Sequence, residues 1–394
     1  MPKVYLDHAA TTPLDTQVRR AMSPFLGHKF GNPSSMHSWG RVARIAVEEA
    51  RGKVAKALNC LSSEVYFTGS TTESANLAVL GLARAYKNNG KHLITTKTEH
   101  HAVLEAFKHL EEEGFEVTYI GVDKSGLVDP KRLMDAIRPS TILVSVMYAN
   151  NEVGTIQPIK TLSSMMAAIT ERRGKEGPPL YFHSDAAAAK YLSWDVRDLG
   201  LDLMTLGPHK FYGPKGTGFL YARVGIKLAP IVFGGSQEGS LRPGTENVAG
   251  IVGAAKAVEI FSSEKKREGD RIETLRDRLI EGVLNKIKNV KLTGHPTQRV
   301  PDIASFAIAG VEGEAMLLHL DKMGIAASSG SACTSGLLEP SHVLLAMGYK
   351  PEMAHGSLRL SLGKSTTVKD VDYTINCLVK IVAELRKMSP MPKS

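Results

Sequence analysis

Short apolar runs and amphipathic stretches alternate along the chain from residue 64 to residue 206. Runs rich in β-branched and aromatic residues predict strands, and stretches with apolar positions three or four residues apart predict helices. The predicted strands are residues 64–68, 92–96, 115–120, 141–147, 180–184 and 203–206. The predicted helices between them are residues 73–86, 101–113, 130–137 and 162–170. This alternation indicates an α/β fold with a mostly parallel central sheet and helices on both faces.

The pattern changes in the last third of the chain. We predict two helices there, then mixed strands and helices, and a long C-terminal helix; the segments are residues 248–261, 265–288, 303–308, 314–321 and 358–362, and the helix after Thr367. Thr367 suits the N-cap of that last helix because Asp370 follows three residues later. We place a domain boundary near residue 262. The large domain is then residues 14–262, and a smaller α+β domain comprises residues 1–13 and 263–394.

Composition and charge narrow the classes of function. The chain has 394 residues, 43% of them hydrophobic, which is enough for two domains with sizeable cores. Its net charge of +9 comes from scattered Lys and Arg residues, and aromatic residues make up only 6%. We therefore expect no direct DNA binding. We interpret the charge first as that of an ordinary soluble basic enzyme, whose mildly positive surface could also attract an anionic substrate or an acidic protein partner.

Cysteine content and the N-terminal sequence indicate the compartment. Three cysteines, Cys60, Cys333 and Cys377, do not make a disulfide framework, which favours a reducing environment. The N-terminus has no apolar run of signal length, and no stretch approaches the ~20 apolar residues that span a bilayer. We expect a cytoplasmic protein that does not bind membranes.

Two charged residues follow two successive predicted strands. Asp185 directly follows the strand 180–184, and Lys210 comes shortly after the strand 203–206. Ligands of a parallel sheet bind at the carboxyl ends of its strands. Pyridoxal phosphate (PLP) needs a Lys amine for a Schiff base and an Asp that keeps its ring nitrogen protonated. The spacing alone leaves open that both residues lie on surface loops.

A third element of such a site would hold the phosphate. Residues 68–74, Thr-Gly-Ser-Thr-Thr-Glu-Ser, join a predicted strand to a predicted helix. A helix N-terminus of this kind favours an anion, although the same residues also suit an ordinary N-cap. His100 and Asn151 follow two other strands at the same edge of the sheet. There an imidazole could stack on a ring or move protons; a structural role for each stays open.

The C-terminal third supplies two further candidates. Cys333 stands among Ser, Gly and Ala in residues 328–336, so we predict an exposed loop and a nucleophile. Cys60 and Cys377 are interpreted as structural. Arg359 stands between apolar neighbours in a predicted strand, and its guanidinium matches the carboxylate of an amino acid. The alternative is an edge-strand Arg that faces solvent.

Nine motifs are spread over nearly the whole chain. They are YLDHAATTP near the start, GNPSSMH at 31–37, TEHHAV at 98–103, NNEVG at 150–154, HSDAA at 183–187, HKFYGPKG at 209–216, RPGTENVAG at 242–250, SSGSACTSG at 328–336 and SLRLSLG at 357–363. In this order they resemble the cysteine desulfurases that serve iron–sulfur cluster assembly. These enzymes are fold-type-I PLP-dependent members of the class V aminotransferase family. The resemblance implies removal of sulfur from L-cysteine to give L-alanine and an enzyme persulfide.

The resemblance also implies roles at the cofactor. Lys210 holds PLP and moves protons, Asp185 pairs with the ring nitrogen, and His100 stacks on the ring as part of the catalytic apparatus. The phosphate is bound by Ser70, Thr71, Thr72 and His209. Thr245 matches the position that reaches the phosphate of a neighbouring subunit, so the resemblance implies a homodimer.

Substrate and sulfur transfer involve three residues in this resemblance. Asn151, which also contacts the cofactor, and Arg359 bind the substrate carboxylate. Cys333 attacks the substrate sulfur, and is also a candidate transient ligand of an iron–sulfur cluster. The persulfide would pass to a sulfur acceptor or iron–sulfur scaffold protein, with tRNA thiolation as a second destination.

Two positions depart from the family pattern. Ala188 stands where relatives usually carry a Gln that bonds the phenolic oxygen of PLP, and Gly207 where they usually carry a Ser that binds phosphate. Each lost hydrogen bond costs about 1–3 kcal/mol, so we expect slower turnover or easier cofactor loss.

Several alternatives stay open at this point. A selenocysteine lyase or an aminotransferase-like enzyme shares the PLP residues, although it would have less need of Cys333. A non-enzymatic scaffold or nucleic-acid-binding role has the net charge and the two departures as its support. Lys215 competes with Lys210 as the residue that holds PLP.

Overall fold

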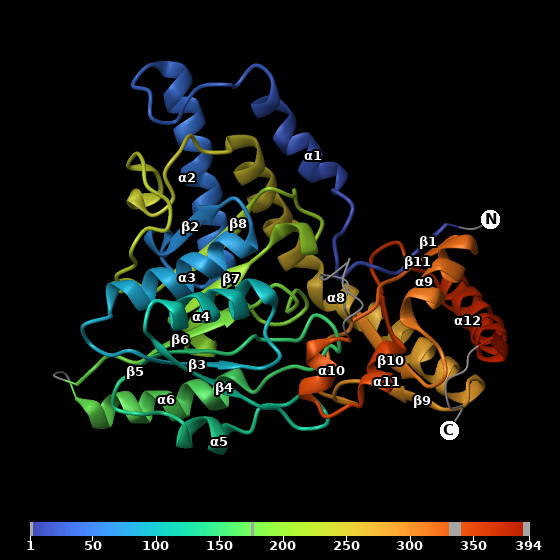
Figure 1. Ribbon diagram of the computed structural model, residues 1–394. Coiled ribbons are helices and arrows are strands. Elements are labelled where there is room, and N and C mark those ends of the chain that lie inside the picture. Colours follow the sequence, from blue (N-terminus) through green and yellow to red (C-terminus); the bar gives the residue numbers. More distant parts are fainter. Residues whose placement is uncertain (1–2, 175–176, 331–339, 389–394) are drawn as a thin grey trace.

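A seven-stranded sheet forms the centre of the larger part of the protein (Figure 1). The computed structural model describes residues 3–174, 177–330 and 340–388. The strands are β2 (Val65–Thr68), β3 (His92–Thr96), β4 (Glu116–Ile120), β5 (Thr141–Ser145), β6 (Tyr181–Asp185), β7 (Leu203–Leu206) and β8 (Gly218–Ala222), in the order β2-β8-β7-β6-β5-β3-β4. Only β8 runs against its neighbours in this sheet, so the predicted mostly parallel α/β fold is confirmed.

Strand β8 was missed by the sequence analysis. Its five residues follow β7 through a short 3-10 turn and a Gly-rich segment, with no helix between the two strands. An alternation of strands and helices therefore gives no signal for it. The antiparallel pairing of β8 with both β7 and β2 lets β2 join the edge of the sheet in the same direction as the parallel strands.

Helices cover both faces of the sheet. One face packs on α3 (Thr71–Ala85) and α4 (His101–Glu112), and the other on α2 (Ser38–Leu58), α6 (Ile159–Arg173), α7 (Val196–Leu199) and the first half of α8 (Val248–Lys286). Successive strand residues alternate between the two cores: Leu93 and Leu143 face α3, and Ile94 and Val144 face the other layer. This alternation with apolar residues on both sides is typical of a buried parallel sheet. The remaining helices of this part are α1 (Thr16–Met22), α5 (Pro130–Asp135), and the 3-10 turns η1 (Ser23–Leu26), η2 (Ser62–Glu64), η3 (Pro208–Lys210) and η4 (Gln237–Ser240).

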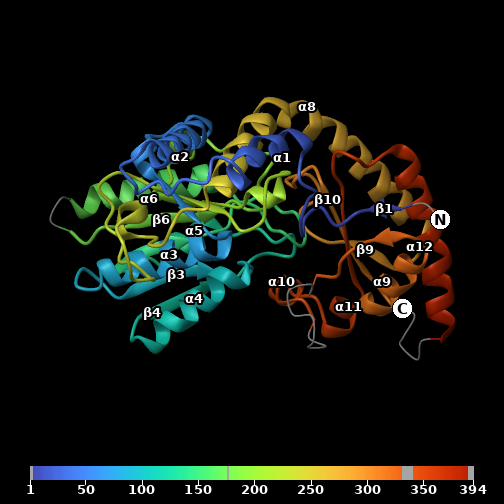
Figure 2. The ribbon, with the colours of Figure 1, turned by 90° about the horizontal axis from the view of Figure 1, so that it is seen from above.

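A single helix, α8, replaces the two helices predicted over residues 248–261 and 265–288. It is 39 residues long and runs from the large sheet to the C-terminal part of the molecule (Figure 2). The intervening residues Ser262, Ser263 and Glu264 include neither Pro nor Gly, so nothing ends the helix there. The domain boundary near residue 262 stays a prediction, and α8 crosses it without a break.

The C-terminal part has its own apolar core. Its elements are β9 (Val290–Leu292), β10 (Ile303–Ile308), β12 (Ser357–Ser361), β11 (Ile325–Ala326), α9 (Gly313–Lys322), α10 (His342–Ala346), α11 (Pro351–His355) and α12 (Val368–Met388). Strands β12, β10 and β9 form an antiparallel sheet. The N-terminal strand β1 (Val4–Tyr5) pairs with β11, so the first residues of the chain lie in this part. The predicted cap of α12 is confirmed, because Asp370 N–H donates to Thr367 Oγ1 at 3.3 Å.

No helix among the described residues is both long enough and apolar enough to cross a membrane.

Candidate active site

A cavity of about 480 Å³ opens at the carboxyl ends of the parallel strands. It lies between the large sheet and the C-terminal part, and residues from both line it. Nine of the residues singled out from the sequence meet there: Ser70, Thr71, Thr72, His100, Asn151, Asp185, His209, Lys210 and Arg359. Two do not: Thr245 is exposed and does not line the cavity, and Cys333 lies outside the described residues.

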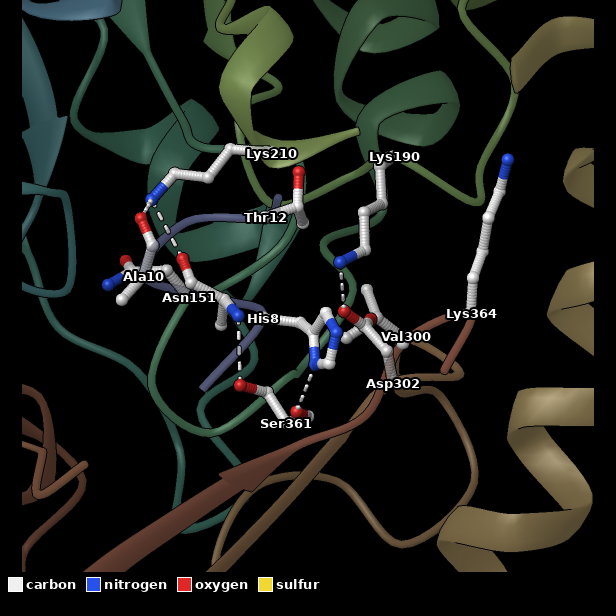
Figure 3. A network of polar contacts seen from close by, with 12 residues as sticks. His8, Ala10, Thr12, Asn151, Lys190, Lys210, Val300, Asp302, Ser361 and Lys364 are labelled. Carbon is white, nitrogen blue, oxygen red and sulfur yellow. Dashed lines mark hydrogen bonds and ion pairs between the residues drawn. The ribbon is translucent and has the colours of Figure 1, made fainter. Parts of the chain in front are cut away.

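Lys210 enters the cavity from the 3-10 turn η3, directly after β7. Its Nζ donates to the carbonyl oxygens of Ala9 and Ala10, at 2.7 and 2.8 Å (Figure 3). Thr12 fixes this arrangement, because its N–H and its hydroxyl both donate to the carbonyl of His209. The N-terminal segment is therefore part of the site. The sequence analysis found this segment only as a motif. Every residue has a backbone carbonyl, so the sequence could not indicate that those of Ala9 and Ala10 bind Lys210.

Asp185 is the last residue of β6. Its Oδ1 accepts hydrogen bonds from Thr205 Oγ1 on the neighbouring strand, at 3.1 Å, and from Ala187 N, at 3.0 Å. Asp185 is 5% exposed. Both donors are neutral groups. They orient the carboxylate, and neither of them offsets its negative charge. It can hold a proton on a ring nitrogen placed in the cavity.

His100 forms the N-cap of α4. Its Nδ1 accepts from Ala102 N at 3.1 Å, which leaves Nε2 as the protonated nitrogen of a neutral ring. Burial lowers the pKa of this imidazole. The next residue, His101, faces His342 instead, with ring centroids 4.7 Å apart. Of the two histidines, His100 is the one that lines the cavity and can stack on a flat ligand.

The N-terminus of α3 forms one end of the cavity. Ser70 caps this helix, with Oγ accepting from Glu73 N at 3.0 Å. The first N–H groups of a helix and its dipole favour a phosphate. Thr71 Oγ1 is buried and has no hydrogen-bond partner among the described residues. A buried hydroxyl that needs a partner, at a helix N-terminus, fits a phosphate-bearing cofactor.

Gly207 is explained by Thr71. A Cβ added at residue 207 would lie 2.1 Å from Thr71 Oγ1. The backbone of Gly207 is extended, with φ −125°, so its conformation does not demand a glycine. The hydroxyl of Thr71 thus occupies the space that a Ser side chain at residue 207 would need.

Arg359 lies in the middle of β12 and is 4% exposed, so the alternative of a solvent-facing Arg is wrong. One guanidinium nitrogen donates to the carbonyl of Asn151 at 2.9 Å, and another pairs with Asp7 at 3.0 Å. Its Nε is buried without a partner among the residues that the structure describes. The guanidinium is thereby held at the cavity wall, where it can donate hydrogen bonds to a substrate carboxylate.

Glu152 was not predicted as a site residue. Its carboxylate accepts from Ser341 Oγ at 2.5 Å, and a Cβ on Gly330 would lie 2.8 Å from the same oxygen. Burial raises the pKa of Glu152 to about 7. Gly330 and Ser341 flank the segment 331–339 that contains Cys333. Glu152 therefore bonds Ser341 at one side of this segment and lies close to Gly330 at the other, an arrangement of distant residues that the sequence does not signal.

Comparisons with known proteins agree with this geometry. The family model described as aminotransferase class-V matches residues 4–374. A curated relative, the cysteine desulfurase IscS of Dictyoglomus turgidum, is 51% identical over 389 residues, which cover 98% of this chain and 96% of the relative. Among solved structures, a NifS-like protein matches with a TM-score of 0.89 at 36% identity, over 97% of this chain and 100% of the other. The structure titled SspA in complex with cysteine matches with a TM-score of 0.80 at 33% identity, over 91% and 99% of the two chains.

Proposed function

The chain belongs to the class-V aminotransferase family and, within it, to the cysteine desulfurases, and we propose on that basis that it takes sulfur from L-cysteine through Cys333. The observation that carries the proposal is the single cavity in which Lys210, Asp185, the N-terminus of α3 and Arg359 meet. Enzymes of this family depend on PLP. The cavity offers a covalent anchor, a partner for the ring nitrogen, a helix N-terminus for the phosphate and a partner for the substrate carboxylate.

Each part of the cofactor has residues suited to hold it. Lys210 would be the anchor, Asp185 would pair with the ring nitrogen, and His100 would stack on the ring. The phosphate would be bound by Ser70, Thr71, Thr72 and His209. Burial and the neighbouring lysines lower the pKa of His209 to about 4, so its imidazole is neutral and able to donate a hydrogen bond at neutral pH. When bound, PLP withdraws electrons from the Cα of an amino acid attached to it.

The remaining steps fall to the residues of the chain. Arg359 and Asn151 orient the substrate carboxylate, so that the Cα proton points toward Lys210. The Lys210 amine takes this proton and later returns one to the product. Cys333, as a thiolate, attacks the substrate sulfur. The Cβ–S bond breaks, an S–S bond forms, and the carbon fragment keeps the electron pair and gains a proton. The products are L-alanine and a persulfide on Cys333.

We further propose a homodimer. Large apolar side chains are exposed on residues 26–45 and 232–233, among them Phe30 at 70%, Trp39 at 52% and Phe233 at 84%. Exposed apolar side chains of this size favour a protein partner. Thr245 is also exposed, which agrees with a role at the phosphate of the second subunit. The persulfide would pass to an iron–sulfur scaffold or another sulfur acceptor protein, and Cys333 would be a candidate ligand of a nascent cluster in that encounter.

The experiment measures alanine and sulfide formed from L-cysteine, with a reductant, by wild-type protein and two variants. Cys333→Ala is expected to form neither product, and Cys377→Ala, which changes a buried cysteine of α12, is the matched control. Equal molar alanine and sulfide from the wild type and the control support the proposal. No products from a wild type that holds PLP would contradict it, and L-selenocysteine would then be the next substrate to test.

The assignment of Lys210 has its own test. Borohydride reduction of the loaded enzyme, followed by mass spectrometry, is expected to place the pyridoxyl group on Lys210. Lys215 also lines the cavity but is exposed, so a pyridoxyl group on Lys215 would overturn the assignment.

A further inference from the structure

Lys190 and Asp302 form a buried ion pair in the wall of the same cavity. Lys190 Nζ lies 2.7 Å from Asp302 Oδ2, and each side chain is 3% exposed (Figure 3). Both residues line the cavity together with Lys210, Asp185 and His8. A pair this deep is costly to desolvate, and an apolar pair of similar volume is often no less stable. Its position at the cavity wall points to a function beyond packing.

The polar groups of this pair are only partly used. An ammonium group has three N–H donors, and within the described part of the chain Lys190 Nζ has one ion-pair partner, Asp302, and also lies over the Tyr191 ring, 5.4 Å from its centroid. Asp302 Oδ1 is buried and has no partner there either. The remaining N–H donors of Lys190 are thus available to an acceptor bound in the cavity.

His8 also lines the cavity and lies beside this ion pair (Figure 3). Its Nδ1 faces the carbonyl oxygen of Ser361 at 3.1 Å, so Nδ1 carries the proton of the neutral ring. Burial and then the Lys190 charge lower the pKa of His8 to about 4. His8 is therefore neutral at neutral pH and does not compete as a cation. Lys190 is the charged donor on this side of the cavity.

Lys190 also lies close in the sequence to Ala188 and Asp185. It follows Ala188 by two residues, and Ala188 lines the cavity with a methyl group that cannot donate a hydrogen bond. Asp185, five residues before Lys190, faces the ring nitrogen in the proposed function. A single short segment therefore places the carboxylate of Asp185, the methyl group of Ala188 and the ammonium group of Lys190 in the lining of one cavity.

We propose that Lys190, held in place by Asp302, supplies positive charge to the anionic ring oxygen of the bound cofactor, at the place where Ala188 offers no donor. This inference rests on the proposed function, because it assumes that PLP occupies the cavity. Lys190 is a positioning residue in this role. It sets the electrostatic environment of the nitrogen through which Lys210 holds the cofactor, and it strengthens cofactor binding.

The sign of the effect follows from Coulomb's law. A cation disfavours protonation of a neighbouring nitrogen that becomes positive, so Lys190 lowers the pH at which that nitrogen loses its proton. Protonation of this nitrogen changes the colour of PLP bound to a lysine. Removal of this one charge from the cavity wall is expected to raise the midpoint of the colour change by about one pH unit.

The test is a spectroscopic pH titration of the loaded enzyme without substrate. Lys190→Met is expected to raise the midpoint and to lose PLP faster on dialysis, and Lys190→Arg is expected to stay near the wild type. Lys364→Met is the matched control. Lys364 lies nearby and pairs with Glu264 at 2.7 Å, but it does not line the cavity, so its removal should leave the midpoint unchanged.

A second variant keeps the inference testable if Lys190→Met does not fold. Lys190→Met leaves Asp302 buried without its partner, so Lys190→Met/Asp302→Asn removes both charges and is expected to shift the midpoint in the same direction by a smaller amount. A midpoint unchanged in both variants, with PLP bound, overturns the inference and leaves the proposed function intact. A protein that takes up no PLP at all contradicts the proposed function instead.

Discussion

Moving the hydroxyl group from residue 71 to residue 207 tests how the cavity binds the phosphate of the cofactor. Gly207 and Thr71 compete for one space, since a Cβ on residue 207 would lie 2.1 Å from Thr71 Oγ1. If Thr71 supplies the hydroxyl that binds phosphate, either residue can do so, but both cannot be present without strain. Thr71→Ala and Gly207→Ser should therefore each weaken PLP binding, and the double variant should recover it.

The magnitudes follow from two different causes. Thr71→Ala removes one hydrogen bond to an anion, which is worth roughly 1.5 kcal/mol, and the dissociation constant of PLP should rise about tenfold. Gly207→Ser forces a contact far below van der Waals distance, and overpacking of this kind costs about 1–3 kcal/mol. The double variant removes the clash and restores a hydroxyl, so its PLP affinity should lie within about threefold of the wild type.

The assay is a fluorescence titration of the apoenzyme with PLP, which needs no catalytic turnover. Thermal unfolding of each apoenzyme reports the strain separately from cofactor binding. A double variant that binds PLP as weakly as the two single effects added together would refute the reasoning, because the two positions would then act independently.

Three further predictions concern the substrate, the flanks of the Cys333 segment and the subunit contact. Arg359→Lys should raise the KM for L-cysteine about tenfold with a smaller change in kcat, because a lysine cannot make the two-pronged contact with a carboxylate; an unchanged KM in steady-state kinetics would contradict this. The raised pKa of Glu152 means that the native protein keeps a proton that the unfolded chain releases, so this stabilisation is present below about pH 4.5 and is lost as the pH rises through about 7. Glu152→Gln should accordingly show a smaller fall in Tm from acidic to neutral pH than the wild type, and parallel curves would argue against a protonated Glu152. Trp39→Glu combined with Phe233→Glu should convert the dimer to a monomer in sedimentation, whereas a dimer that persists in this variant would place the interface elsewhere.

Much of the fold could be predicted from the sequence because its strands are buried on both faces. Strands β3, β7 and β10 begin and end where the apolar runs do. The errors have physical causes. The Ser-Ser-Glu sequence at 262–264 is polar but contains no helix breaker, so the local pattern suggested a break that the backbone does not make.

The site was predictable to the extent that its chemistry lies in side chains at strand ends. Asp185 and Lys210 follow from that rule, and Arg359 from a charge among apolar neighbours. Three features did not follow from it. The carbonyls of Ala9 and Ala10, the contact of Glu152 with Ser341, and the pairing of Lys190 with Asp302 all join residues far apart in the sequence.

The N-terminal segment that holds Lys210 has a consequence for how the enzyme is made. Asp7 pairs with Arg359 and lies opposite Ser361, more than 350 positions later in the chain. A ribosome releases the first of these residues long before the second, and loops that long close late in folding. The large sheet can form on the growing chain. The cavity wall, however, lacks Arg359 until the last tenth of the protein has emerged. Cofactor loading is thus expected to follow the folding of the sheet that carries Lys210.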